Sequence, residues 1–173
     1  MTTHFYTATS LDGFIATPEH SLDWLLKQDF DEEGPMAYPA FIEGIGALAM
    51  GASTYEWLRK HDSVWSYEQP TWVFTHRALE TTEGADVRIT QANIRDVYAE
   101  MTAAANGKDL WIVGGGDLAG QFADQGLLDE VWLQYAPVML GAGAPVLPRA
   151  LNLELIELAR NRSFLCGRYR VAG

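Results

Sequence analysis

A continuous apolar run followed by three glycines constrains this sequence most. Leu110-Trp111-Ile112-Val113 precedes Gly114-Gly115-Gly116, and a helix is predicted from about Leu118 to Gly126. Such a run is typical of a strand that is covered on both faces of a sheet. Glycines between a strand and a helix let backbone N–H groups approach an anion at the positive end of the helix. A tight turn that packs closely against the sheet explains the same glycines, so both interpretations stay open.

Strand-like segments alternate with helix-like segments over the first 135 residues. The predicted strands are His4–Ser10, Ala47–Met50, Thr71–Thr75, Val87–Thr90, Leu110–Val113 and Val131–Tyr135, and further helices are predicted at Ser21–Leu26, from Ser53 and at Asn93–Ala105. This alternation predicts an α/β fold with a mostly parallel central sheet and helices on both faces. The tail from Leu153 to Val171 is predicted to add an antiparallel strand pair. At 173 residues the chain has the length of a single domain, residues 1–173.

Composition excludes several classes of partner. Twelve Lys and Arg against 23 Asp and Glu give a net charge of −11, which repels nucleic acid and anionic membrane surfaces. The single cysteine, Cys166, excludes an internal disulfide and a cysteine-based metal site, and no two histidines have ligand spacing, so we expect no metal. There is no apolar run of membrane-spanning length and no basic leader segment, so we expect a cytoplasmic protein with a small-molecule substrate.

Small and polar residues gather where four predicted strands end. They are Ser10–Gly13, Gly51–Thr54, Thr75–Arg77 and Gly114–Asp117. Ligands of parallel α/β sheets bind at the carboxyl ends of the strands, so these segments are expected to form one site. Ser53 and Thr54 either offer donors to a phosphate or simply cap a helix. Thr75, His76 and Arg77 could bind a phosphate monoester or be a solvated loop.

Three acidic residues bear on the chemistry of that site. Asp12 follows the first strand in a turn, and Asp29 comes five residues after Trp24. A carboxylate beside an aromatic ring in a cleft has a raised pKa and can donate a proton, whereas Asp31, Glu32 and Glu33 suggest a solvated acidic face. Asp117 follows the glycines and must point away from a bound diphosphate.

A hydrolase is a further alternative at the second strand end. Gly51-Ala52-Ser53-Thr54-Tyr55 partly matches the nucleophile elbow of serine hydrolases, but Tyr55 replaces its last glycine. Only His61 and His76 are candidate partners for Ser53, and neither lies in a suitable late loop. The motif therefore favours a helix start over a nucleophile.

The order of these strand ends resembles the dihydrofolate reductase fold, and more closely the C-terminal reductase domain of the bifunctional riboflavin-biosynthesis deaminase/reductase. The matching stretches are Ser10–Ala16, Met50–Glu56, Trp111–Gly116, Asp129-Glu130 and Pro137–Gly143, and the resemblance covers essentially the whole chain. The resemblance implies an NADPH-dependent reductase, dimeric in that branch. It also implies a cis peptide bond, here between Gly114 and Gly115.

The resemblance carries roles to individual residues. Ala8 and Ile15 are expected at the nicotinamide, Trp24 and Asp29 at the substrate, and Asp29 or Asp12 as the proton source. The other expected cofactor contacts are Gly51, Ser53 and Thr54 for the phosphates, Thr75, His76 and Arg77 for the adenosine ribose, and Val113, Gly114, Gly115, Gly116, Asp117, Leu118 and Gln121 for the pyrophosphate and ribose.

Two departures from the family pattern bear on specificity. Ala52 stands where many relatives carry a basic residue that binds the 2′-phosphate of NADPH. Unless Arg77 replaces it, NADH is not excluded as the cofactor. The arginine-rich segment expected for a phosphoribosyl substrate is also missing. We therefore expect hydride transfer to a small pyrimidine- or pterin-like heterocycle, possible substrates including 5-amino-6-(5-phosphoribosylamino)uracil. The alternative is a catalytically silent, dimeric nucleotide-binding domain.

Overall fold

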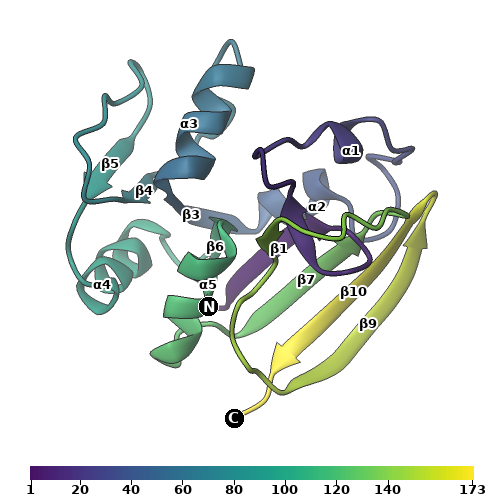
Figure 1. Cartoon of the computed structure of the whole chain (residues 1–173). Coiled ribbons are helices and arrows are strands. Elements are labelled where there is room, and N and C mark those ends of the chain that lie inside the picture. Colours follow the sequence, from purple (N-terminus) through teal and green to yellow (C-terminus); the bar gives the residue numbers. More distant parts are fainter.

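The chain folds around one large twisted sheet. The computed structural model describes residues 1–173 and contains an eight-stranded sheet in the order β5-β4-β3-β6-β1-β7-β10-β9 (Figure 1). Its strands are β1 (Thr3–Thr9), β3 (Ile45–Gly51), β4 (Thr71–Phe74), β5 (Val87–Thr90), β6 (Asp109–Gly114), β7 (Glu130–Tyr135), β9 (Leu153–Asn161) and β10 (Phe164–Val171). The helices are α1 (Asp23–Leu26), α2 (Tyr38–Glu43), α3 (Ala52–His61), α4 (Ile94–Ala104) and α5 (Gly116–Asp124), and a separate two-stranded sheet joins β2 (Phe14–Ala16) to β8 (Ala144–Pro145).

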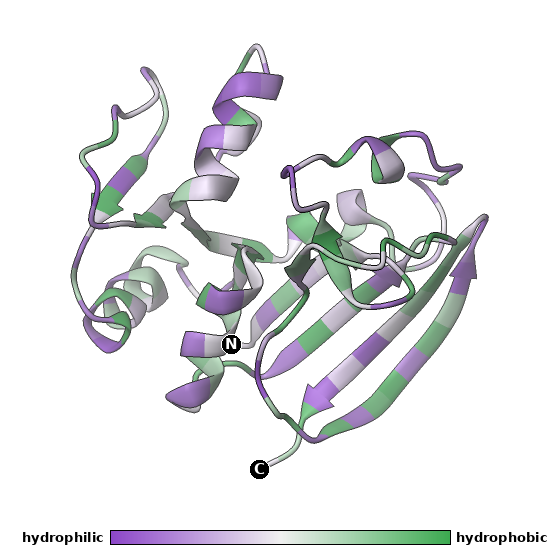
Figure 2. Ribbon diagram, viewed as in Figure 1, coloured by the Kyte–Doolittle hydropathy of each residue, from purple (hydrophilic) through white to green (hydrophobic).

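Strand direction confirms the fold class expected from the sequence. The strands from β5 to β7 pair in parallel, whereas β10 pairs antiparallel with both β7 and β9. Hydrophobic and hydrophilic residues alternate along β9 and β10 (Figure 2), as in strands with one face toward solvent. The parallel part therefore brings its carboxyl ends to one edge, and the C-terminal hairpin extends the sheet beyond that part.

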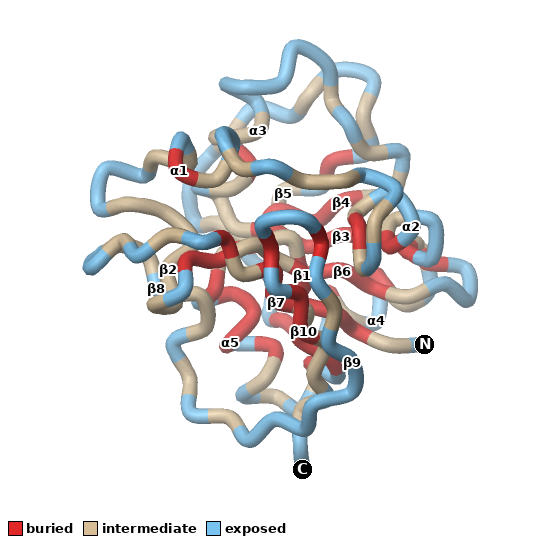
Figure 3. The backbone as a smooth tube through the Cα atoms, turned by 90° about the vertical axis from the view of Figure 1, so that its right-hand side faces the viewer, coloured by how far each residue is buried: buried red, intermediate tan, exposed pale blue.

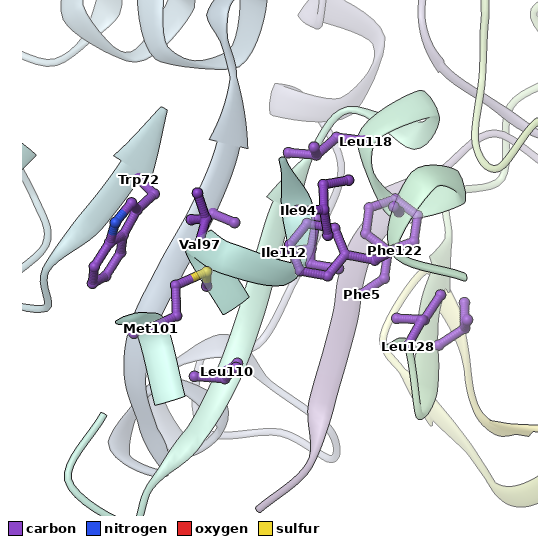
Figure 4. Close-up of a cluster of buried hydrophobic side chains, with 14 of the residues drawn as sticks. Phe5, Trp72, Ile94, Val97, Met101, Leu110, Ile112, Leu118, Phe122 and Leu128 are labelled. Atoms are coloured by element: carbon purple, nitrogen blue, oxygen red, sulfur yellow. The ribbon is translucent and has the colours of Figure 1, made fainter. Parts of the chain in front are cut away.

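Helices cover both faces of the parallel strands, and the buried residues lie mainly in the strands between them (Figure 3). On one face, side chains of α4 and α5, including Val97, Met101 and Phe122, pack over Phe5 and Ile112 (Figure 4). On the other face, α2 and α3 cover smaller clusters of buried residues. Burial of these apolar faces is the main force that holds the helices on the sheet.

The structure adds short elements that the sequence pattern does not reveal. The strands β2 and β8 are too short to show a two-residue period. Pro39 lies in the first turn of α2, where its missing N–H costs no hydrogen bond. Helix α5 begins at Gly116, two residues before the predicted start. None of the helices has the length and apolar character needed to cross a membrane.

The core makes a direct prediction for stability. Phe122 is fully buried and packs edge-to-face against Phe74, with 6.0 Å between the ring centroids. Replacing Phe122 with Ala removes the ring and leaves a cavity, so we expect the free energy of unfolding to fall by about 3–5 kcal/mol. Urea unfolding followed by circular dichroism measures this change. Val64→Ala, at a residue that is 76% exposed, is the control and should cost less than about 0.5 kcal/mol; equal losses would contradict the assigned core.

Candidate functional site

The site lies at the carboxyl ends of β3 and β6. These two strands are parallel neighbours, and after them the chain continues in opposite directions along the sheet. In the register of β3 and β6, Met50 pairs with Gly114, so both strands end at the same place. From there α3 leads from β3 to β4, and α5 leads from β6 to β7 on the other side. Such a reversal leaves a crevice at the carboxyl edge of a sheet, and ligands of open α/β sheets bind in it.

A cleft of about 1510 Å³ occupies this crevice. The N-termini of α3 and α5 both line it, and neither helix has a side-chain cap at its N-terminus. By contrast, α4 is capped by Asn93, whose side chain accepts a hydrogen bond from the N–H of Asp96. The first N–H groups of a helix have no partner within the helix and carry a partial positive charge. Two sets of such donors therefore face a single cleft.

The residue before each of these helices is a glycine that the fold itself does not require. Gly51 and Gly115 have φ angles of −84° and −86°, which any residue can adopt. A Cβ atom on Gly51 would meet no atom closer than 3.9 Å, and one on Gly115 none closer than 4.0 Å. The missing side chains therefore leave room within the cleft, beside the free helix N–H groups, for a ligand to approach the backbone.

The neighbouring Gly116 has a different reason to be glycine. A Cβ atom there would lie 2.3 Å from the carbonyl oxygen of Val146, which is an impossible contact. The two interpretations of the glycine run thus apply to different residues: Gly116 permits close packing, and Gly115 leaves room in the cleft. The peptide bond between Gly114 and Gly115 is cis, as the resemblance implied.

The carboxylate of Asp117 has hydrogen-bond partners within the protein. Arg149 donates to its Oδ1 at 3.2 Å, and the Gln121 side chain donates to its Oδ2 at 2.8 Å. The same guanidinium donates to Asp124 Oδ2 at 2.9 Å, so it only partly offsets the negative charge that is unfavourable beside a bound diphosphate. The sequence gives no indication of this role for Arg149, because the residue lies in a loop 32 positions further along the chain.

The cleft has one lobe on each side of the two helix N-termini. Along the edge the strands end in the order β5, β4, β3, β6 and β1. At about 4.8 Å between neighbouring strands, the distance from β5 to β1 is about 19 Å. The β4–β5 lobe is lined by Thr75–Arg77 and by residues 90–93, and the β1 lobe by residues that include Ala8, Ile15 and Leu22.

The β1 lobe lies at a gap in the strand pairing between β1 and β6. Pairing between β1 and β6 stops at Phe5 and Ile112, whereas β1 continues along β7 as far as Thr9. Beyond Phe5, β1 therefore has a partner strand on one side only. Ala8 and Val113 line the cleft on the two sides of this opening.

Every residue predicted to contact the cofactor lines this one cleft, from Ala8 and Ile15 through the two helix starts to Arg77 and Gln121. Binding of the cofactor by these residues stays a prediction. The cleft residues that the sequence analysis did not single out include Glu56 of α3, whose carboxylate pairs with the guanidinium of Arg77. The position of Glu56 directly after the helix start in the sequence was the only available signal.

Asp12 does not line the cleft, contrary to the expectation of a catalytic acid there. Its carboxylate accepts hydrogen bonds from the Ser10 hydroxyl at 2.6 Å and from the N–H groups of Leu140 and Gly141 at 3.0 and 2.7 Å. These hydrogen bonds, that of Ser10 first, lower the pKa of Asp12 from 3.8 to about 2. Asp12 is thus ionised at neutral pH and holds the 138–141 loop against the first strand end, which does not favour proton donation.

Asp29 and Trp24 also lie outside the cleft. Helix α1 ends at Leu26, so Asp29 is in a loop, where its side chain is largely exposed and pairs with Arg162 at 3.0 Å. Trp24 is buried against Ala136, Phe164 and Cys166. The five-residue interval matches the reductase pattern in the sequence, but the short helix turns the two side chains toward the C-terminal hairpin.

The hydrolase alternative finds no support in the geometry. Ser53 has no hydrogen bond to a histidine. His61 instead bonds through Nδ1 to the carbonyl oxygen of Trp57 at 2.9 Å and stacks on that residue's ring. A serine nucleophile needs a base within hydrogen-bond reach. Ser53 is therefore best interpreted as part of the helix start.

The sheet order and the cleft define an α/β domain with a ligand-binding cleft at the carboxyl edge of its parallel strands. The sequence model of the RibD C-terminal domain family matches residues 52–167, and the chain belongs to this riboflavin-biosynthesis reductase-like family. The uncharacterized Bacillus subtilis protein YwjB is 31% identical over 163 residues, covering 94% of this chain and 91% of its own.

Solved structures agree with the family assignment. A protein from Shewanella sp. PV-4, solved under the name "putative riboflavin biosynthesis protein", has a TM-score of 0.86 at 27% identity, with 100% of both chains covered. Dihydrofolate reductase from Enterococcus faecalis, solved in complex with NADP(H), has a TM-score of 0.65 at 14% identity and covers 99% of this chain and 97% of its own. At that identity the second likeness shows the fold alone.

The hydrogen bonds of Asp12 predict a pH-dependent contribution to stability. Because its pKa in the folded state lies below the ordinary value of 3.8, ionised Asp12 stabilises the fold above about pH 4. This contribution is lost as the pH falls through about 2. We expect Asp12→Asn to lower the free energy of unfolding at pH 7, and the difference from the wild type to shrink as the pH approaches 2. Urea unfolding across this pH range measures it.

Asp29→Asn is the matched control, since it removes an equally charged side chain from an exposed ion pair. A smaller destabilisation than that of Asp12→Asn is expected at pH 7. A difference between wild type and Asp12→Asn that stays constant from pH 7 to pH 2 would rule out the assigned role of Asp12.

Proposed function

We propose that the protein is a reductase that binds a reduced nicotinamide dinucleotide, NADPH or NADH, and delivers hydride to a small heterocycle. The observation that carries this proposal is the pair of uncapped helix N-termini, each preceded by a glycine, that line one cleft between two lobes. A dinucleotide matches this arrangement, because its diphosphate lies between two nucleosides as the helix N-termini lie between the two lobes. Membership of a reductase-like family supports the same chemistry.

The backbone supplies most of the attraction for the diphosphate. Of the Lys and Arg residues of the chain, only Lys60 and Arg77 line the cleft, and the chain as a whole carries a charge of −11. The N–H groups at the starts of α3 and α5 and the two helix dipoles offer a fixed, uncharged site for an anion. Such a site suits a ligand whose phosphates lie in the middle of the molecule.

The β1 lobe is the better place for the reacting nicotinamide ring. Ile15, Leu22 and Leu25 give it apolar walls, and the opening between β1 and β6 admits a flat ring. When bound, the reduced nicotinamide would supply the hydride, and the protein would position the ring and exclude water. The second nucleoside would then bind in the β4–β5 lobe, which has a polar lining.

The proton needs a source other than Asp12 and Asp29. Glu19, His20 and Asp23 are the titratable residues that line the cleft beside α1, and we propose them as the candidates. Each can act directly or through a water molecule. With no free arginine available, a pyrimidine- or pterin-like ring without a phosphate fits the cleft better than a phosphoribosyl substrate.

A second candidate function is a dinucleotide-binding domain without turnover. The absence of both predicted acids from the cleft favours it. Single-turnover mixing with a panel of pterins and pyrimidines separates the two functions: oxidation of bound NADPH supports the reductase, and binding without oxidation across the panel supports the silent domain.

Gly51 gives the sharpest test of dinucleotide binding. Ala at this position suits the backbone but puts a methyl group between the two helix starts, so we expect affinity for NADPH to fall about tenfold or more, or about 1.4 kcal/mol. Fluorescence titration measures the affinity, and the melting temperature should hardly change. Gly44→Ala, at another glycine with an ordinary φ of −82° but outside the cleft, is the control and should bind like the wild type. Equal binding by both variants would count against the site.

We also propose that a second copy of the chain covers the outer face of the C-terminal hairpin. Leu155 and Leu158, on the edge strand β9, are 54% and 59% exposed. They pair with Tyr169 and Gly167 of β10, which lie four and two residues from the exposed Leu165, so all of these residues share one face. Exposed leucines that share a face of an open sheet mark an interaction surface.

The dimer is tested by placing charge on this face. We expect the wild type to be a dimer in size-exclusion chromatography with light scattering, and the double variant Leu155→Glu, Leu158→Glu to be a monomer, because burying two carboxylates is costly. Val64→Glu, at an exposed residue elsewhere, should stay dimeric. A monomeric wild type at micromolar concentration would refute the proposed dimer.

A further inference from the structure

The guanidinium of Arg77 is occupied by a carboxylate inside the cleft. Its Nη1 donates to Glu56 Oε1 at 3.1 Å, and its Nη2 donates to Glu56 Oε2 at 2.9 Å. Both residues line the cleft. This two-pronged geometry is the one in which a guanidinium binds a carboxylate or a phosphate most strongly. The donors that a phosphate monoester would use are therefore already engaged.

The fold places the two side chains together. Strands β3 and β4 are neighbours, and Gly51 at the end of β3 pairs with Phe74 at the end of β4. Glu56 follows Gly51 by five residues along α3, and Arg77 follows Phe74 by three residues in the next loop. The N–H of Arg77 also donates to Thr75 Oγ1 at 3.0 Å, which fixes the loop. The Glu56–Arg77 pair thus lines the β4–β5 lobe near the start of α3.

No other arginine can replace Arg77 in this lobe. The one other Lys or Arg that lines the cleft, Lys60, is in the last turn of α3, away from the helix start, and its ammonium group cannot form a two-pronged contact. Ala52, in the first turn, adds no charge. With Glu56 and Arg77 paired, the part of the lobe beside the strand ends has no free cation.

We propose that Glu56 is a specificity-determining residue that biases the cleft toward a dinucleotide with a free 2′-hydroxyl, NADH, and against the 2′-phosphate of NADPH. The inference rests on the proposed function, which puts the second nucleoside in the β4–β5 lobe. A phosphate monoester carries a charge of about −1.5 to −2 at pH 7. To bind it, Arg77 has to leave Glu56, whose negative charge then lies beside the incoming phosphate. A free ribose 2′-hydroxyl does not require Arg77 to leave Glu56, and it is not repelled by the charge of Glu56.

Replacing Glu56 should leave the fold intact. The two side chains of the pair are 44% and 57% exposed, for Glu56 and Arg77 respectively. Ion pairs with this exposure contribute little to stability. Glu56→Gln keeps the shape of the side chain and removes its charge, so that Arg77 becomes available to the ligand.

The test is a pair of fluorescence titrations, with NADH and with NADPH, on the wild type and on variants at the same ionic strength. We expect the wild type to bind NADH at least as tightly as NADPH. In Glu56→Gln the affinity for NADPH relative to that for NADH should rise about five- to tenfold, and Glu56→Gln with Arg77→Gln should lose that gain. Glu80→Gln is the matched control, because Glu80 pairs with Arg59 at 3.6 Å and lies outside the cleft.

The outcomes separate this inference from the function on which it rests. A wild type that binds neither dinucleotide overturns the proposed function and the inference with it. If both dinucleotides bind but Glu56→Gln changes their relative affinity no more than Glu80→Gln does, the proposed function stands and the role of Glu56 is wrong. A gain that persists without Arg77 also overturns the mechanism. Adenosine 2′,5′-bisphosphate and AMP give the same comparison without the nicotinamide.

Discussion

The parallel pairing of β3 with β6 is the constraint on which the site depends. It joins two strands that are more than 50 residues apart in the sequence, and it brings Gly51 beside Gly114. Because the chain leaves these strands in opposite directions, the starts of α3 and α5 line the same cleft. Hydrophobic burial of both helices against the sheet fixes their directions. The donors of the site are thus held by the core rather than by mobile side chains.

Two of the charged side chains near the helix starts are held in ion pairs. Arg149, which also binds Asp124, pairs with Asp117 at the start of α5, and Glu56 pairs with Arg77 near the start of α3. What remains for a central anion is the partial charge of the helix N-termini, which does not depend on any ionisable group. This arrangement reconciles an anion-binding cleft with a strongly acidic protein. It also means that single charge changes at the two ends of the cleft can alter which ligand is bound without removing the site.

Much of the fold could be predicted from the sequence. Long apolar runs such as Leu110–Val113 and the helical periodicity of residues 93–105 both indicate segments that pack in the hydrophobic core. The cleft residues were found for the same reason, since strand ends in a parallel sheet must meet. The short elements β2, β8 and α2 gave no periodic signal. The placement of Asp12, Trp24 and Asp29 is decided by contacts with residues more than 100 positions away, which the local sequence does not reveal.

Glu56 and Arg149 show the other limit of sequence reasoning. Their partners are set by tertiary contacts between a helix and a loop, so residue type alone indicated only surface charge. The account as a whole depends on both helix starts binding one ligand together. Amide NMR of the labelled protein titrated with NADH tests this directly. The account predicts that the N–H resonances of Ser53 and Thr54 and those of Asp117 and Leu118 shift together and saturate at the same ligand concentration. Shifts at only one of the two helix starts, or at neither, would contradict it.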